Sequence, residues 1–161
     1  MGTIYVGVGE YAASKSPNDV VKTLALGSCV AVIMMDPKNR SAGLLHVALP
    51  DSSISNKRAV ERPGMFADSG IPMLIKEMNR LGYNGSGKMI VKLAGGASIM
   101  DSNQIFNIGK RNILAVRKIL WKYKLGAIAE DLGDSFSRTV AIDLSNGRVT
   151  LSSPARGEWL L

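Results

Sequence analysis

The amino-acid sequence predicts an α+β fold, a layered α/β sandwich of mixed, mostly antiparallel β-sheet with two main helices. Short segments rich in β-branched residues outnumber the amphipathic helical segments. Strands and helices do not alternate strictly along the chain, which argues against a doubly wound parallel sheet. An Asn146-Gly147 dipeptide between two strand-like segments is a strong signal for a β-hairpin.

The N-terminal part is predicted to be mostly strand. Pro17 marks a loop over residues 14–19, and the polar, aperiodic residues 51–64 indicate a surface loop. Asp36 to Arg40 contain the Pro, Asp and Asn residues that favour a turn, so the strands on either side are expected to form a hairpin. The predicted strands of this part are 3–8, 20–23, 29–35 and 42–49.

The C-terminal part carries both predicted helices. The first follows Asp68 or Ser69 as its cap, tolerates Pro72 only in its first turn, and ends at Gly82. The second spans about 108–124, with Asn107 as candidate cap and an apolar stripe at helical spacing. The predicted strands of this part are 89–94, 127–132, 137–143 and 148–151.

The composition is that of an ordinary globular protein. The chain has 161 residues, which corresponds to a single domain over residues 1–161. Its 46% hydrophobic residues exclude intrinsic disorder. The longest apolar stretch, residues 24–35, is shorter than the ~20 residues of a membrane-spanning helix. The N-terminus lacks the positive region of a signal peptide, so we expect a cytoplasmic protein with no stable membrane insertion.

The chain has one cysteine, Cys29, and one histidine, His46. A single cysteine excludes an intrachain disulfide. Zinc sites take three or four protein ligands, which one Cys and one His do not supply without several carboxylates, so no zinc site is expected. Taken separately, each residue is more often structural than catalytic.

The predicted hairpin brings these two residues together. A turn centred on Pro37 and Lys38 pairs residues whose numbers add up to about 75, which places Cys29 opposite His46; a sum of 77 places them on a diagonal. Either odd sum puts both side chains on one face, and an even sum would separate them. A thiol beside an imidazole is a candidate nucleophile with its base. An imidazolium lowers the pKa of a neighbouring thiol, so the pair is expected to rest as thiolate and imidazolium.

Three further residues are candidates for the same site. Gly27 allows a tight turn and close approach to a substrate, and the backbone N–H groups around Gly27 and Ser28 are candidates for an oxyanion hole. Thr23 carries a hydroxyl that is able to orient the imidazole. The alternative for Thr23 is a residue that merely favours strand structure, and composition alone favours that alternative.

Several segments match one known family. The most specific are TLALGSCV at residues 23–30 and HVALP at residues 46–50; ADS at 67–69, GGAS at 95–98, NIGKRN at 107–112 and ED at 130–131 match as well. Together they resemble the CheD family, the chemoreceptor glutamine deamidases of chemotaxis, over nearly the whole chain. The sequence departs from the family pattern near Gly133, where it has Asp134 and Ser137 in place of glycines.

The resemblance implies a catalytic set of Cys29, His46 and Thr23 on a layered sandwich. It implies that Cys29 attacks the side-chain amide of a receptor glutamine, that His46 protonates the departing ammonia, and that water hydrolyses the thioester to glutamate. Some members also hydrolyse glutamyl methyl esters. The implied partners are the cytoplasmic domains of methyl-accepting chemoreceptors and the CheC phosphatase, and no cofactor is implied.

The formal net charge of +7 favours anionic partners. Residues 102–129 contain no acidic residue, and the basic residues on or near the predicted second helix are Lys110, Arg111, Arg117, Lys118, Lys122 and Lys124. This pattern fits either a solvated helix face or docking on an acidic partner. A binding module that acts through CheC and receptors with little catalysis is therefore the alternative to an enzyme. A nucleic-acid-binding domain has only the net charge in its favour, because no recognisable motif supports it.

Overall fold

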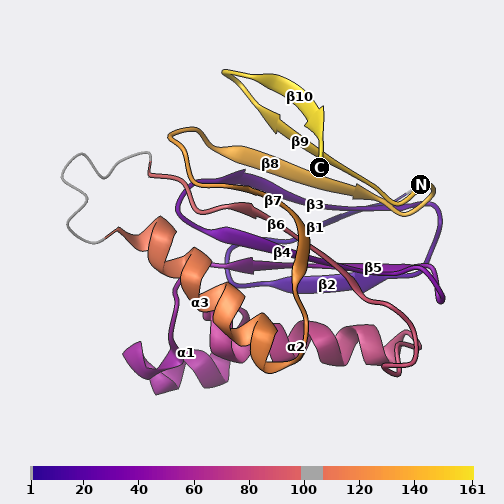
Figure 1. Ribbon diagram of the computed structural model, residues 1–161, viewed down its shortest axis with the longest axis horizontal. Coiled ribbons are helices and arrows are strands. Elements are labelled where there is room, and N and C mark those ends of the chain that lie inside the picture. Colours follow the sequence, from indigo (N-terminus) through magenta and orange to yellow (C-terminus); the bar gives the residue numbers. More distant parts are fainter. Residues whose placement is uncertain (1, 99–106) are drawn as a thin grey trace.

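The protein consists of two stacked five-stranded sheets and a layer of helices on the outer face of one of them (Figure 1). The structure is a computed structural model that describes residues 2–98 and 107–161. Strands β1 and β3 pair in parallel, as do β6 and β7, and the other described pairs are antiparallel. The predicted α+β sandwich with mixed, mostly antiparallel sheets is therefore confirmed.

The first sheet has the strand order β1-β3-β8-β9-β10. The Asn146-Gly147 turn joins β8 to β9 as predicted, and Gly147 has the positive φ of 71° that such a turn requires. The strands of this sheet are β1 (Gly2–Tyr5), β3 (Asp19–Leu26), β8 (Arg138–Asp143), β9 (Arg148–Ser153) and β10 (Gly157–Leu160).

The second sheet has the order β2-β5-β4-β6-β7 and lies between the first sheet and the helices. Its central strands β4 and β5 form the predicted hairpin, and every residue in both is buried because both faces of the sheet are covered. The strands of this sheet are β2 (Tyr11–Ser14), β4 (Val30–Asp36), β5 (Ser41–Val47), β6 (Ile90–Gly95) and β7 (Ala127–Leu132).

The helices are α1 (Asn56–Glu61), α2 (Ala67–Arg80) and α3 (Ile108–Lys122), with 3-10 turns at Ser52–Ile54 and Pro63–Met65. Helix α2 begins one residue before the expected caps, so Pro72 lies in its second turn. The Asp68 carboxylate instead accepts hydrogen bonds from the Ser52 N–H (2.9 Å) and hydroxyl (2.6 Å). Helix α3 has Asn107 at its N-cap position, as expected. In the described part of the chain, no helix has both the length and the apolar character needed to cross a bilayer.

Three elements differ from the prediction. Helix α1 lies inside the predicted loop 51–64. It buries no side chain, so its sequence lacks the apolar periodicity from which a helix is predicted. Strands β2 and β10 were not predicted either. Each has four residues and lies at the edge of its sheet, where one neighbouring strand is enough to hold it. Neither segment contains a β-branched residue, which is the signal that predicted the equally short strand β1.

Alternate side chains of β4 enter two apolar layers. Val30, Val32 and Met34 pack with the helices, whereas Ala31 and Ile33 pack against the first sheet. Strand β5 follows the same rule, with Leu45 and Val47 toward the helices and Leu44 toward the other sheet. The parity of a residue number on these strands therefore decides which layer its side chain enters.

A buried ion pair ties the two sheets together along one edge. Arg138 in β8 donates from Nε to Asp131 Oδ1 in β7 at 2.7 Å, and its side chain is 1% exposed. The other carboxylate oxygen accepts from Trp159 Nε1 in β10 at 2.9 Å. Arg138 also donates to the Gly133 carbonyl at 2.9 Å and stacks on the Phe136 ring at 4.2 Å. One carboxylate thus joins β7 to two strands of the other sheet.

We expect Asp131→Asn to lower the free energy of unfolding by about 3 kcal/mol, because it leaves the buried Arg138 guanidinium without a counter-charge. The matched control is Glu130→Gln, which breaks the exposed pair with Arg117 and should cost less than about 1 kcal/mol. Urea unfolding of the two variants measures the difference. Equal losses would contradict the structural importance of the cross-sheet pair.

Candidate active site

The three residues predicted to form a catalytic set lie at the same end of the sandwich. Thr23 lies on β3 of the first sheet, and His46 lies on β5 of the second. Cys29 lies in the connection between β3 and β4, one residue before β4 begins. Because β4 and β5 are antiparallel, the start of β4 and the end of β5 meet at one edge. The chain therefore crosses from one sheet to the other at Cys29.

The register of the hairpin puts Cys29 and His46 on the same side of the second sheet. Ala31 pairs with His46, so the residue numbers add up to 77, which is the diagonal alternative of the prediction. Cys29 lies two residues before Ala31 and packs against the apolar layer between the sheets. His46 has the parity of Leu44, which faces the same layer.

His46 is held by a hydrogen bond that crosses between the sheets. Its Nδ1 lies 2.7 Å from Thr23 Oγ1, and both residues are buried. The Thr23 hydroxyl donates its hydrogen to the Val6 carbonyl at 2.6 Å, because a carbonyl only accepts. Thr23 Oγ1 is then left to accept a hydrogen from Nδ1, so the imidazole carries its proton there. The other nitrogen, Nε2, has a free lone pair and no hydrogen-bond partner among the described residues.

The backbone of His46 is fixed by the segment that precedes β2. The Gly9 N–H donates to the His46 carbonyl at 2.9 Å, and the His46 N–H donates to the Glu10 carbonyl at 3.0 Å. Gly9 has a φ of 76°, and a Cβ there would collide with the Met65 side chain. A glycine is needed for the chain to pass between His46 and the 3-10 turn that contains Met65.

Burial favours the uncharged forms of both Cys29 and His46. Desolvation raises the pKa of the Cys29 thiol above its ordinary value, and a hydrogen bond from the Cys29 backbone N–H opposes this increase. Desolvation lowers the pKa of His46 to about 4, against a smaller opposing effect of the Glu10 carboxylate. The expected resting thiolate–imidazolium pair is therefore corrected: in the free protein, the cost of burying two charges favours a neutral thiol and a neutral imidazole.

The loop that carries Cys29 is held through three successive backbone carbonyls. The Gly27 carbonyl accepts from the Ala97 N–H at 2.9 Å, and the Cys29 carbonyl accepts from the Gly96 N–H at 2.8 Å. The Ser28 carbonyl accepts from the side chain of Asn112 in α3 at 3.0 Å. No backbone carbonyl of the described residues accepts from the N–H groups of Ser28 and Cys29. The carbonyls of the loop are thus engaged, whereas no described carbonyl occupies these two N–H groups, of which that of Cys29 interacts with its own sulfur.

Sequence reasoning did not single out Asn112, although it belongs to one of the matching segments. Asn112 is fully buried and lies on the same stripe of α3 as Ile113, Val116 and Leu120. A polar residue inside an otherwise apolar stripe is the signal in the sequence that would have identified it.

The segment that departs from the family pattern lies next to the support of the nucleophile loop. The Ser98 N–H donates to the Asp134 carbonyl at 2.9 Å, and the Gly133 N–H donates to the Gly95 carbonyl at 2.9 Å. Asp134 has a φ of 63°, a conformation that glycine adopts more easily. Asp134 therefore holds this position at some conformational cost.

Two other features of the structure bear on ligands. Within residues 2–98 and 107–161, no three His, Cys, Asp or Glu side chains lie together in a group that could hold a metal ion. A cavity lined by residues such as Asp36, Arg40 and Asn146 lies at the β4–β5 turn, which is the opposite end of β4 from Cys29. This cavity is not part of the candidate active site.

Comparison with known proteins points to one family. The family model described as CheD chemotactic sensory transduction matches residues 48–153, a span that begins two residues after His46. A probable chemoreceptor glutamine deamidase of Syntrophotalea carbinolica is 52% identical over 160 residues, which cover 99% of each chain. Another of Syntrophus aciditrophicus is 44% identical over 95% of each chain. The chemoreceptor glutamine deamidase of Thermotoga maritima is 38% identical over 96% of this chain and 94% of its own.

We expect the imidazole of His46 to titrate near pH 4 and to carry its proton on Nδ1 above that pH. Because its pKa is lowered, the neutral imidazole with a free Nε2 is present at neutral and mildly acidic pH and is lost only as the pH falls through about 4. The chain has one histidine, so the ring resonances in an NMR titration need no assignment. Thr23→Val, which removes the acceptor for Nδ1–H, should change the tautomer ratio. A midpoint near 6.5 would contradict the burial argument.

Proposed function

The chain belongs to the CheD family, and from that premise we propose that it is a protein-glutamine amidohydrolase that converts glutamines of methyl-accepting chemoreceptors to glutamates. The substrate class follows from the names of its relatives. The observation that carries the proposal is the 2.7 Å contact between Thr23 Oγ1 and His46 Nδ1. It leaves a buried imidazole with its basic nitrogen free, on the same face of the sheet as the only cysteine.

His46 is the general base in this proposal. Its Nε2 takes the proton of the Cys29 thiol while Sγ attacks the side-chain amide carbon of the glutamine. The pKa directions support a proton transfer that takes place on attack rather than in advance, because both groups are more stable uncharged. Thr23 holds the imidazole and does not exchange a proton, since its own hydrogen is donated to the Val6 carbonyl.

The tetrahedral intermediate needs hydrogen-bond donors for its oxyanion. The N–H groups of Ser28 and Cys29 are the candidates, because no described carbonyl accepts from them and the loop that presents them is held through its carbonyls. Gly27 contributes the start of this loop. Donors fixed before the reaction stabilise developing charge without reorganisation, and each typically contributes about 10²-fold or more to the rate.

The remaining steps complete the hydrolysis. The His46 imidazolium protonates the amide nitrogen, ammonia leaves, and a thioester between Cys29 and the substrate carbonyl remains. His46 Nε2 then deprotonates a water molecule, which attacks the thioester. The C–S bond breaks, the proton returns to the Cys29 sulfur, and glutamate is released. A glutamyl methyl ester would react through the same thioester with methanol as the leaving group, so a methylesterase side activity belongs to the proposal.

We expect Cys29→Ala and His46→Ala each to abolish the conversion of glutamine to glutamate in a purified receptor cytoplasmic fragment. Thr23→Val should lower kcat about tenfold or more, because the imidazole loses the partner that orients it. Mass spectrometry of the fragment and the release of ammonia measure the reaction. The matched control is Thr150→Val on β9, a threonine outside the site. Full activity of the folded Cys29→Ala variant would refute the thioester mechanism.

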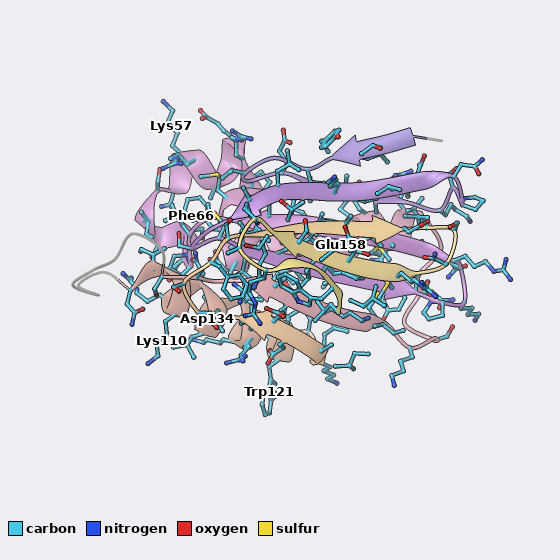
Figure 2. All side chains as sticks on the ribbon, turned by 90° about the horizontal axis from the view of Figure 1, so that it is seen from above. Lys57, Phe66, Lys110, Trp121, Asp134 and Glu158 are labelled. Carbon is cyan, nitrogen blue, oxygen red and sulfur yellow. The ribbon has the colours of Figure 1, made fainter. Side chains whose placement is uncertain are left out.

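A second role, docking on an acidic protein partner, has its own supporting observation; the resemblance implies the receptor coiled coil and a CheC-type phosphatase as partners. The outer face of α3 presents Trp121, which is 82% exposed and projects away from the molecule (Figure 2), and Leu114, which is 54% exposed. Arg111, Lys118 and Lys122 are exposed and fall on the same stripe at helical spacing. Tryptophan and arginine are enriched among the residues that dominate binding energy at interfaces, so this face is a candidate docking surface.

We expect the double change Lys118→Glu and Lys122→Glu to weaken binding to the CheC-type phosphatase at low salt about tenfold or more, because it reverses the charge of this face. Cys29→Ala should bind as tightly as the wild type. The control with the same net charge is Lys15→Glu with Arg148→Glu, on exposed residues outside α3. Calorimetric titration measures the affinities. Equal weakening by both double variants would mean that only net charge matters.

A further inference from the structure

One side chain of α3 contacts the segments of both Cys29 and His46. Asn112 is fully buried, and its Nδ2 donates to the Ser28 carbonyl and to the Ala48 carbonyl, each at 3.0 Å. Ser28 directly precedes the nucleophile, and Ala48 follows His46 by two residues. A single carboxamide therefore bridges the nucleophile loop and the strand of the base.

This bridge lies where the sheet stops holding the two segments together. The ladder between β4 and β5 ends at the pair Val30 and Val47. The next pair in the same register would be Cys29 and Ala48, but Cys29 lies outside the strand. The two N–H groups of a planar carboxamide diverge at a fixed angle, so they suit two carbonyls on separate segments. Asn112 thus holds the two segments together just beyond the last pair of the ladder, next to the proposed nucleophile.

The rest of the first two turns of α3 makes this contact rigid. A Cβ at Gly109 would lie 2.5 Å from the Gly96 carbonyl oxygen and 2.7 Å from that of Ala97, so only glycine allows the helix to approach this backbone. The same two residues, Gly96 and Ala97, donate their N–H groups to the nucleophile loop. The start of α3 therefore supports the loop both directly, through Asn112, and indirectly, through the segment against which Gly109 packs.

We propose that Asn112 is a positioning residue, whose carboxamide sets the separation and orientation of Cys29 relative to His46 without touching the substrate. The inference rests on the proposed function of these two residues. A misplacement of about 1 Å in a reacting pair costs on the order of 10²-fold in rate, so a bridge of this kind matters for the reaction.

The unsatisfied oxygen of Asn112 supports a role in positioning over a role in stability. Asn112 Oδ1 is buried and has no hydrogen-bond partner among the described residues. Burying an unpaired acceptor is unfavourable, so Oδ1 adds nothing to stability, whereas loss of Nδ2 would leave the Ser28 and Ala48 carbonyls without this donor. The role of Asn112 therefore depends on the two N–H donors of Nδ2, and packing alone does not explain why this residue is an asparagine.

The test compares Asn112→Leu, which removes both donors at similar volume, and Asn112→Asp, which leaves at most the one O–H donor of a protonated carboxyl, with Val116→Ala one turn along the same helix. Val116 is fully buried in the core under α3 and is not part of the site. We expect both Asn112 variants to lower kcat for deamidation about tenfold or more, with KM changed less than about threefold. Val116→Ala should lower the thermal stability but leave kcat within about twofold.

A second measurement does not require a substrate. NMR titration of the single histidine reports the surroundings of His46 in each folded variant. We expect its pKa to rise from about 4 toward its ordinary value in Asn112→Leu, because the loosened segments admit water, and to stay unchanged in Val116→Ala.

The outcomes separate failure of this inference from failure of the proposed function. A wild type without amidase activity would refute the function, and the titration would still test the bridge. Wild-type kcat and an unchanged His46 titration in folded Asn112→Leu would overturn the inference. An equal loss of kcat in Val116→Ala would overturn it as well, because general damage to the core would then explain the effect. Should Asn112→Leu not fold, the smaller Asn112→Ser, which retains one donor, is judged by the same two measurements.

Discussion

The hydrogen bond between Thr23 and His46 is the interaction on which the geometry of the site depends. It joins residues from two different sheets at 2.7 Å, and it continues to the Val6 carbonyl at 2.6 Å. Because the Val6 carbonyl only accepts, Thr23 must donate its hydrogen to that carbonyl, and His46 must donate its own to Thr23. The position of the imidazole proton, and with it the free lone pair on Nε2, follows from this arrangement. The two stacked sheets are thus a requirement of the proposed chemistry as well as of the fold.

The base and the nucleophile are held by different parts of the molecule. His46 belongs to a buried strand with neighbours on both sides, and hydrogen bonds of its backbone to Gly9 and Glu10 add to the support from the sheet. Cys29 lies beyond the end of its strand, so no ladder fixes it. Its loop is held instead through its carbonyls by α3 and the residues that follow β6. This division leaves the Ser28 N–H and the Cys29 sulfur without a carbonyl partner on the loop, while the imidazole is held in place from both sides.

Burial sets the electrostatics of the site. Cys29 and His46 lie at the end of an apolar layer between the sheets, and this layer makes a charged pair unfavourable before a substrate binds. The resting thiolate–imidazolium pair was expected from the two residue types alone, and that expectation applies to a thiol and an imidazole that water can solvate. Residue types alone do not report desolvation, so the correction required the packing around them. The same holds for Arg138, whose burial against Asp131 no local pattern indicates.

The sequence by itself determined the layered α+β architecture, the β4–β5 hairpin and the helices α2 and α3, because hydrophobic periodicity and turn chemistry are local properties of the chain. It left the register of the hairpin open, so the tertiary structure decided that Cys29 and His46 share a face. The sequence also did not reveal β2, β10 or α1, since short edge strands and a helix without buried residues leave no periodic signal. Only the tertiary structure decided that Thr23 reaches His46 from the opposite sheet, and that Asn112 binds the carbonyls of Ser28 and Ala48. These contacts join residues 23 to 84 positions apart, and such separations are brought together by the packing of layers rather than by any local pattern.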